Sequence, residues 1–192
     1  MIWMSRLGAI FFSLTTSLAL GAPIASVPEP SGYRLESYRA PTPATLKGAK
    51  VLTTNQAHDV WENKQAVFID VLPHAPRPEE LPANALWREP ERKDIPGSIW
   101  LPDTGYGVIA DVILRYFQRG LVEATEGNKN RSLVFYCQKD CWMSWNAAKR
   151  ALSLGYHDVS WYPEGSDGWA AAAYPLETQT PKPHTENIYR TR

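Results

Sequence analysis

Apolar positions along the chain fall into short continuous runs separated by stretches with helical spacing. The short runs are typical of buried parallel strands, which we predict at Lys50–Thr53, Val67–Val71, Ile99–Leu101, Leu133–Cys137 and Val159–Tyr162. The intervening spacing predicts a helix that is capped by Thr54 or Asn55 and runs to about Glu62, and further helices over Val108–Ala124, Ser144–Leu154 and Gly168–Ala173. Strands that alternate with helices favour a three-layer α/β domain with a mainly parallel central sheet flanked by helices.

The first 21 residues have the pattern of a targeting segment. Arg6 is their only charge, and the apolar run from Leu7 to Leu20 is shorter than the roughly 20 residues that a membrane-spanning helix needs. Ala19 and Gly21 are small residues at the −3 and −1 positions of a cut before Ala22. We therefore predict a signal peptide over 1–21, with export to the periplasm of a bacterial cell and no stable membrane insertion after cleavage.

Proline-rich segments interrupt the regular pattern. Residues 22–49 predict an extended N-terminal arm with at most a short strand around Tyr33–Tyr38. The segment 73–96 is a second proline-rich excursion, and excursions of this length inside a domain are usually functional or wrap a surface. The globular domain is expected over 50–176, and residues 177–192 are expected to form a C-terminal tail.

Composition excludes several classes of function. The chain has 192 residues, with 20 Lys+Arg against 20 Asp+Glu, so no overall field favours nucleic acid. Two cysteines are too few for a disulfide scaffold or a four-cysteine zinc site, and no Cys-x-x-Cys-His haem motif is present. The four histidines have no helical ligand spacing. The sequence therefore predicts a globular protein without a metal or another cofactor.

The candidate chemistry lies around Cys137, which ends a predicted buried strand just before a helix. Chemistry in open α/β sheets gathers at the carboxyl ends of strands, and a helix N-terminus lowers the pKa of a nearby thiol. Cys141 lies four residues later, within the reach of a disulfide. We predict Cys137 and Cys141 as catalytic residues, Cys137 being the more reactive; the alternative is a buried pair that only packs. The expected supporting residues are Gln138, Lys139, Asp140, Trp142, Ser144 and Asp70.

Four sequence elements, in order, resemble the rhodanese-like domain superfamily. They are the strand VFIDV with Asp70, the IPGSIWLP element at Ile95–Pro102, the strand-ending Cys137 followed by a helix with Ala147, Ala148 and Lys149, and GYHDVSWYPEGSDGW at Gly155–Trp169. The resemblance covers about residues 50–176. It implies a rhodanese fold with Cys137 at the sulfur-carrying position.

The loop after Cys137 departs from the typical sulfurtransferase pattern Cys-Arg-x-Gly-x-Arg-Ser. It contains neither arginine nor glycine, and its only cation, Lys139, is opposed by Asp140. Leu72 replaces an arginine often found two residues after the strand aspartate, and Met143 stands where a phosphatase loop would need arginine. The departures disfavour both ordinary thiosulfate sulfurtransfer and phosphatase activity.

The Cys-x-x-x-Cys-Trp pattern, together with WMSWNAAKRAL and YPEGSDGW, resembles the exported "PQQ-dependent catabolism-associated CXXCW motif" proteins, although three residues separate the cysteines here. That resemblance implies an association with periplasmic alcohol oxidation. Its expected partner is a quinoprotein dehydrogenase or the electron-transfer partner of such an enzyme.

Three functional hypotheses remain open at this point. The first is thiol redox chemistry, with Cys137 as nucleophile and Cys141 as its resolving partner. The second is sulfur transfer through a Cys137 persulfide that Cys141 releases. The third is a non-catalytic binding module whose contact surface is the proline-rich segment 73–96 with the tryptophans. Trp142 is expected to cover the thiols, and Trp145 to pack in the core.

Overall fold

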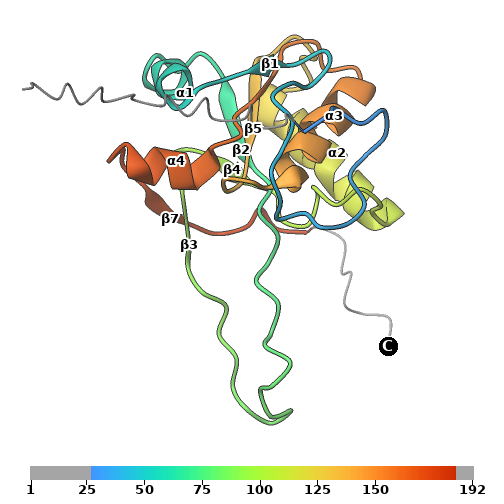
Figure 1. Cartoon of the computed structure of the whole chain (residues 1–192), viewed down its shortest axis with the longest axis vertical. Coiled ribbons are helices and arrows are strands. Elements are labelled where there is room, and N and C mark those ends of the chain that lie inside the picture. The colour runs from blue at the N-terminus through green and yellow to red at the C-terminus, as the bar shows by residue number, and fades with distance from the viewer. Residues whose placement is uncertain (1–26, 185–192) are drawn as a thin grey trace, which may run out of the picture.

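The computed structural model describes residues 27–184, so the predicted signal peptide and the last eight residues lie outside the described part. Its centre is a five-stranded, fully parallel sheet in the order β1-β6-β5-β2-β4 (Figure 1). The strands are β1 (Lys50–Val51), β2 (Val67–Asp70), β4 (Ile99–Trp100), β5 (Leu133–Tyr136) and β6 (Val159–Trp161). The predicted α/β fold with a mainly parallel sheet is confirmed.

Four helices cover the two faces of this sheet. Helices α1 (Thr54–Glu62) and α4 (Gly165–Ala171) lie on one face, and α2 (Asp111–Thr125) and α3 (Trp142–Ser153) lie on the other (Figure 1). Side chains of β5 alternate between two buried clusters: Phe135 faces α2 and α3, whereas Val134 and Tyr136 face α1 and α4. Because both faces are covered, the strand is apolar at every position, as its sequence indicated.

Helix starts differ from the predicted ones by one to three residues. Thr53 caps α1 through a capping box with Gln56, one residue earlier than predicted. Cys141 is the N-cap of α3, so that helix begins two residues before the expected Ser144. Helix α4 begins three residues early because its first turn is held by the backbone of Cys137, as described below. Helix α2 begins at Asp111, three residues later than expected.

A second, two-stranded antiparallel sheet was not predicted. It pairs β3 (Arg92–Asp94) with β7 (Glu177–Gln179), so the expected tail begins with a strand. Both strands are short and polar, and neither has the apolar alternation that marks a strand in sequence. The consequence is that Arg92 and Asp94 are placed in the protein interior.

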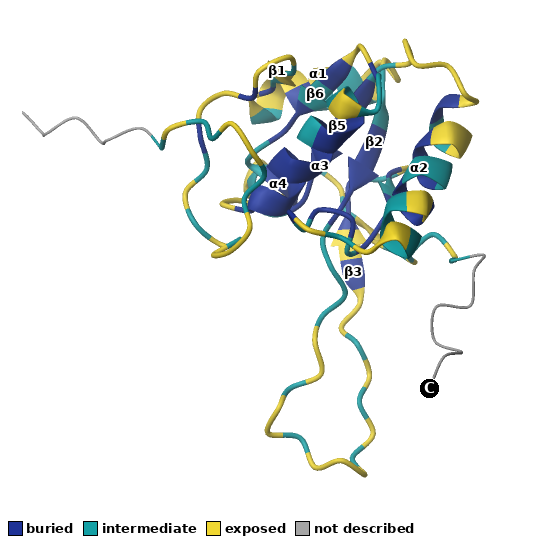
Figure 2. Cartoon of the chain, turned by 90° about the vertical axis from the view of Figure 1, so that its right-hand side faces the viewer, coloured by how far each residue is buried: buried dark blue, intermediate teal, exposed yellow. Residues whose placement is uncertain are grey.

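Between β2 and β3 the proline-rich segment forms a long loop, residues 72–91, that projects away from the domain (Figures 1 and 2). His74 Nδ1 lies 2.9 Å from a carboxylate oxygen of Glu89 and joins the two limbs of the loop. Arg77 donates to the carbonyl oxygens of Pro82 and Ala85 and so closes its far end. Leu86 is 94% exposed.

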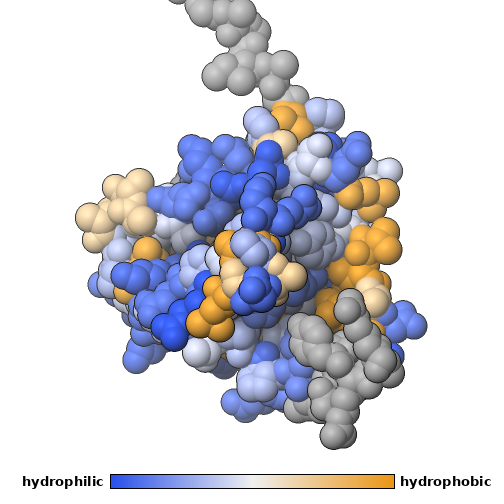
Figure 3. All heavy atoms as spheres, turned by 90° about the horizontal axis from the view of Figure 1, so that it is seen from below, coloured by the Kyte–Doolittle hydropathy of each residue, from blue (hydrophilic) through white to orange (hydrophobic). Residues whose placement is uncertain are grey.

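Figure 3 shows the molecule from below, relative to the view of Figure 1. This face is mainly hydrophilic and has separate apolar patches.

The arm contains no strand at 33–38; it runs as an extended segment against α3. Over residues 27–184, no helix combines the length and apolar character needed to cross a membrane.

Candidate functional site

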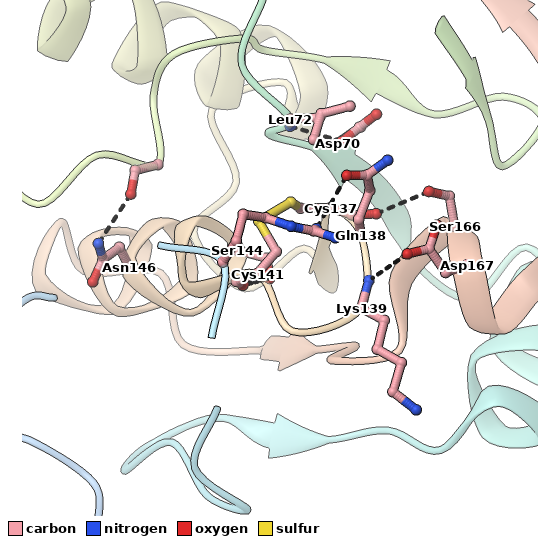
Figure 4. Close-up of a disulfide and its surroundings, with 12 residues drawn as sticks. Asp70, Leu72, Cys137, Gln138, Lys139, Cys141, Ser144, Asn146, Ser166 and Asp167 are labelled. Atoms are coloured by element: carbon pink, nitrogen blue, oxygen red, sulfur yellow. Dashed lines mark hydrogen bonds between the residues drawn. A yellow bond between two sulfur atoms is a disulfide. The ribbon is translucent and has the colours of Figure 1, made fainter. Parts of the chain in front are cut away.

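Cys137 and Cys141 are joined by a disulfide bond at the carboxyl end of β5 (Figure 4). Their Cα atoms are 6.4 Å apart. Cys137 directly follows the strand, and Cys141 is the N-cap residue of α3, so the bond spans the turn that leads from sheet to helix. Both residues are buried, at 0% and 2% exposure. The two residues predicted as catalytic therefore lie together, in the oxidised state.

The backbone conformation of the turn brings Cys137 and Cys141 close enough for the disulfide. Asp140 adopts a left-handed conformation with φ of 52°, and Gln138 forms an isolated bridge with Gly165. Gly165 has a φ of 52°, and a Cβ atom there would lie 2.5 Å from the carbonyl oxygen of Cys137. Gly165 is required for two reasons: its positive φ favours glycine, and the Cys137 carbonyl at the end of β5 leaves no space for a Cβ atom.

Lys139 does not direct its charge toward the sulfurs. Its Nζ lies 3.1 Å from a carboxylate oxygen of Glu164, and its side chain points away from the disulfide (Figure 4). Its backbone N–H donates to Asp167 at 3.3 Å. The ammonium group of Lys139 is therefore paired with the carboxylate of Glu164 and does not face the sulfur atoms.

The N-terminal strap, which we define as residues 33–46 of the arm, lies across the disulfide turn. Arg39 forms an isolated antiparallel bridge with Cys141. Ala40 donates its N–H to the carbonyl of Asp140 at 3.0 Å, and Trp142 donates its N–H to the carbonyl of Tyr38 at 2.9 Å. These bonds satisfy polar groups of the turn and the first N–H of α3, which has no partner within its own helix. The strap therefore contributes to the burial of the two cysteines.

Side chains from α3 hold the strap in place. Trp142 donates its indole N–H to the carbonyl of Pro41, and Trp145 to that of Thr45, both at 3.1 Å. Trp142 packs in the same buried cluster as both cysteines, and Trp145 is a fully buried core residue. The amide of Asn146 accepts from the N–H of Arg34 and donates to its carbonyl, each at 2.9 Å. Asn146 is a strap-binding residue that the sequence analysis missed, although a polar residue on an apolar helix face was its signal.

The remaining polar groups of the turn are also paired. Ser144 donates to the carbonyl of Cys141 at 3.1 Å and accepts from the indole N–H of Trp161 at 3.0 Å. Gln138 accepts from the guanidinium of Arg39 at 3.0 Å. Arg39 thus brings a cation to the loop from the strap, although the loop itself contains no arginine.

Beside the strand that carries Cys137, Asp70 forms a buried ion pair. Arg92 donates Nε–H to Asp70 Oδ2 at 2.6 Å, and the two residues are 8% and 0% exposed. Asp70 Oδ1 accepts from the N–H of Leu72 at 2.9 Å. Burial raises the pKa of Asp70, and Arg92 opposes that rise. The arginine that the sequence lacks at Leu72 is supplied instead by β3.

Ser166 connects this ion pair to the backbone of Cys137. Both terminal nitrogens of Arg92 lie 3.3 Å from Ser166 Oγ, which donates to the carbonyl of Cys137 at 3.2 Å. The N–H of Ser166 donates to the same carbonyl at 2.9 Å. Figure 4 shows the bond from the Ser166 hydroxyl. Asp70 thus reaches the site through two residues that sequence reasoning missed. Arg92 and Ser166 are 74 positions apart, so no local motif signals the contact.

The arrangement can perform two kinds of sulfur chemistry, disulfide exchange and, after reduction, persulfide formation. The chain has only two cysteines, and both are in the disulfide. Across the described residues, no group of three or more histidine, cysteine or carboxylate side chains is placed to hold a metal ion.

The chain is similar to several solved structures of sulfur-handling proteins. A persulfide intermediate of EanB with ergothioneine has a TM-score of 0.50 at 18% identity, over 74% of this chain and 34% of that chain. The polysulfide-sulfur transferase of Wolinella succinogenes has a TM-score of 0.44 at 14% identity, over 75% and 85%. The thiosulfate sulfurtransferase of Pseudomonas aeruginosa has a TM-score of 0.46 at 19% identity, over 70% and 21%. Of these three, the EanB structure has a TM-score of 0.50, and at 18% identity that likeness concerns the fold alone.

No curated protein matches the chain. The sequence profile of the rhodanese-like domain matches residues 53–172, a range that lies within the predicted domain of 50–176. It includes four of the five strands of the parallel sheet (β2, β4, β5 and β6), the four helices and the disulfide between β5 and α3. By its fold and by this match over most of its length, the chain belongs to the rhodanese-like domain family.

Proposed function

We propose that this protein is a thiol–disulfide exchange protein whose Cys137–Cys141 disulfide is reduced and re-formed during its function. The observation that carries the proposal is the position of the disulfide, at the carboxyl end of a central strand and the N-terminus of a buried helix. The N-terminus of α3 stabilises a thiolate on a cysteine beside it. This stabilisation makes that sulfur a better leaving group when the disulfide is attacked.

The exchange proceeds in two substitutions. A thiolate of an external dithiol attacks one sulfur, and the bond between Cys137 and Cys141 breaks, so that the other sulfur leaves with the electron pair as a thiolate. The second thiolate of the reductant then attacks the mixed disulfide and releases the other cysteine. The protein gains two electrons and two protons, and the external dithiol becomes a disulfide.

The disulfide closes too short a loop to be explained mainly as a structural brace. A crosslink over about five residues restricts the unfolded chain by about 2 kcal/mol, against about 4.7 kcal/mol for a loop of about 100 residues. We therefore expect the domain to remain folded after reduction, as an exchange protein must.

The test is equilibration of the protein with mixtures of reduced and oxidised glutathione, followed by alkylation of free thiols and measurement of the intact mass. We expect a single transition between zero and two free thiols, with a reduction potential within the range of thiol oxidoreductases. Cys137→Ser and Cys141→Ser should each lose the transition, while Ser153→Ala, which removes an exposed hydroxyl at the far end of the same helix, should keep it. A disulfide that stays intact under all these mixtures would contradict the proposal.

A second candidate function is sulfur transfer, which membership of the rhodanese-like family supports. In that reaction the reduced Cys137 takes a sulfur atom from a persulfide donor, and the donor leaves as a thiolate. The thiolate of Cys141 then attacks the inner sulfur of the Cys137 persulfide and releases hydrosulfide. This step forms the observed disulfide, and an external dithiol must reduce it before the next cycle. Trapping of a +32 Da species (one added sulfur atom) on Cys141→Ser, absent from Cys137→Ser, would favour this candidate.

The cellular setting that we propose is the periplasm, in support of PQQ-dependent alcohol oxidation. Two features of the sequence support this setting. The Cys-x-x-x-Cys-Trp segment resembles that of the exported CXXCW motif proteins, and the chain has a predicted signal peptide. The proposed partner is a quinoprotein dehydrogenase or its electron-transfer partner. Growth on an alcohol by a deletion strain complemented with Cys137→Ser plus Cys141→Ser tests the setting and the chemistry together. If the wild-type gene restores growth and the double serine variant does not, the result supports the redox function. Full restoration of growth by the double serine variant favours a binding module.

The projecting loop is the observation that favours that third possibility. Residues 72–91 stand away from the domain, and Leu86 at 94% exposure is an apolar side chain with almost no cover from this chain. Leu86→Ser tests the role of the loop, because it removes the apolar contact without altering the buried disulfide. Loss of complementation by this variant, with normal complementation by the double serine variant, would identify the protein as a binding module.

A further inference from the structure

A second buried carboxyl group, that of Asp94, lies next to the Asp70–Arg92 pair and is not used in the exchange chemistry. It ends β3 and is 0% exposed. As an ionised group, neither of its oxygens has a hydrogen-bond partner in the described structure. A buried carboxylate without a partner is costly, and protonation removes most of that cost.

The charges around Asp94 do not balance unless one proton is bound. Asp70 on β2 and Asp94 on β3 are two carboxyl groups, and Arg92 on β3 is the one guanidinium within hydrogen-bond distance of either among the described residues. The hydroxyl of Tyr136, on β5, donates to Ser98 at 2.8 Å and accepts from the N–H of Ile95 at 3.1 Å, so its proton is used outside the cluster. Glu177, on β7 at the rim, adds a further negative charge that acts on Asp94. Burial, followed by the charge of Asp70, raises the pKa of Asp94 to about 8, and Arg92 opposes this rise.

One bound proton also explains how the two carboxyl groups can lie side by side. Two carboxylates are acceptors only, so they cannot form a hydrogen bond with each other. Protonation would give Asp94 an O–H that can donate to Asp70, whose ionised form is stabilised by Arg92. The cluster of Asp70, Arg92 and Asp94 is then neutral.

The cluster lies close to Cys137, although the two occupy opposite faces of the sheet. Asp70 pairs in register with Tyr136, the residue before Cys137, and strands in a sheet are about 4.8 Å apart. The Cys137 side chain belongs to the cluster packed against α3, and Tyr136 to the one packed against α4. Arg92 and Ser166 bridge the two faces at the strand end through the carbonyl of Cys137.

We propose that Asp94 is a positioning residue whose shared proton keeps the surroundings of Cys137 neutral and thereby sets the acidity of that thiol once the disulfide is reduced. The inference rests on the proposed exchange function. Loss of the proton leaves a net negative charge in the cluster, which disfavours the Cys137 thiolate. A unit charge about 10 Å away, at an effective dielectric constant of about 20, changes the pKa of a thiol by about one pH unit.

The first test is direct observation of the proton by infrared spectroscopy. The wild-type protein should show the carbonyl stretch of a protonated carboxyl group at pH 7, and the band should disappear in Asp94→Asn. Glu177→Gln removes a negative charge at the rim and should move the loss of the band to lower pH without abolishing it. Absence of the band from the wild type at pH 7 would overturn the inference.

The second test measures the thiol. In Cys141→Ser, the ultraviolet absorbance of the Cys137 thiolate is followed against pH with and without Asp94→Asn, whose carboxamide has the shape of the protonated acid. Without the substitution, the two groups titrate together, so the transition should be broadened and its upper part displaced by about one pH unit to higher pH. With Asp94→Asn, the transition should be single and should occur at lower pH.

Three outcomes separate this inference from the proposed function. Identical thiolate titrations with and without Asp94→Asn, together with a normal infrared band, would overturn the link to Cys137 and leave the exchange function intact. A wild-type disulfide that never exchanges would overturn the function, while the thiolate titration would still decide on the link. If Asp94→Asn does not fold, Glu177→Gln provides the comparison, because an unchanged thiolate titration in that variant contradicts the inference.

Discussion

The buried proton on Asp94 has a consequence for stability that is opposite to the usual effect of an acidic residue. In the unfolded chain Asp94 has the ordinary aspartate pKa of 3.8, whereas in the folded protein burial raises its pKa to about 8. Folding between these pH values therefore takes up a proton. Asp94→Asn removes that requirement and keeps a donor toward Asp70, so it should stabilise the protein at neutral pH.

The magnitude follows from the two pKa values. A raised folded-state pKa contributes stability that is complete below pH 3.8 and is lost as the pH rises through about 8. The loss is about 1.4 kcal/mol per pH unit within that window. Between pH 3.8 and pH 7 the stability lost by the wild type adds up to about 4 kcal/mol, and relaxation around the site reduces this value. Because Asp94→Asn avoids the loss, we expect it to raise the free energy of unfolding at pH 7 by about 2–4 kcal/mol.

The assay is urea unfolding followed by tryptophan fluorescence at several pH values from 4 to 9. The quantity of interest is the difference in unfolding free energy between Asp94→Asn and wild type. It should be smallest near pH 4, increase up to about pH 8 and then remain constant. Asp59→Asn, an exposed aspartate on α1, is the matched control and should follow the wild type throughout. If the curves for Asp94→Asn and wild type are parallel, Asp94 is ionised in the folded protein and the reasoning is refuted.

Four further predictions concern the site and the chain terminus. Arg92→Met should destabilise the fold by about 3–5 kcal/mol in chemical unfolding because Asp70 stays buried without its partner, with Arg92→Lys intermediate. Asn146→Ala should cost about 1–3 kcal/mol and speed reduction of the disulfide by dithiothreitol, since it frees the strap; unchanged reduction would show that the strap does not limit access. Thiosulfate:cyanide turnover should be far below that of an arginine-loop rhodanese measured alongside, and Gln138→Arg should increase it because arginine binds the anionic donor. N-terminal sequencing of the exported protein should begin near Ala22; Met1 on a membrane-bound protein would contradict this.

Much of the fold could be predicted from the sequence because its elements carry local signals. The central strands are covered on both faces, so each is a continuous apolar run, and the helices between them repeat with a period near 3.6. Cys137 could be placed at the strand end for the same reason, and Cys141 is close enough in sequence for a disulfide to be expected. These features depend on neighbours within a few residues along the chain.

The partners of the disulfide turn could not be predicted, because they come from distant segments. Arg92 lies in a short charged strand whose partner, β7, is more than 80 residues away, so neither strand has an apolar pattern of its own. The strap is held by backbone N–H and carbonyl groups and by Asn146, and backbone groups have no sequence signature. The direction of Lys139 depended on Glu164, a residue of the α4 turn.

The sequence by itself thus determined the order of the central strands and the helices, the sheet core and the position of the two cysteines, since each depends on burial and spacing along the chain. Only the tertiary structure decided the electrostatic surroundings of the pair. It brought Asp70, Arg92 and Asp94 into one buried cluster and connected that cluster to Cys137 through Ser166. The physical reason is that charge interactions in a low-dielectric interior depend on distance in space, and chain folding sets that distance without regard to sequence separation.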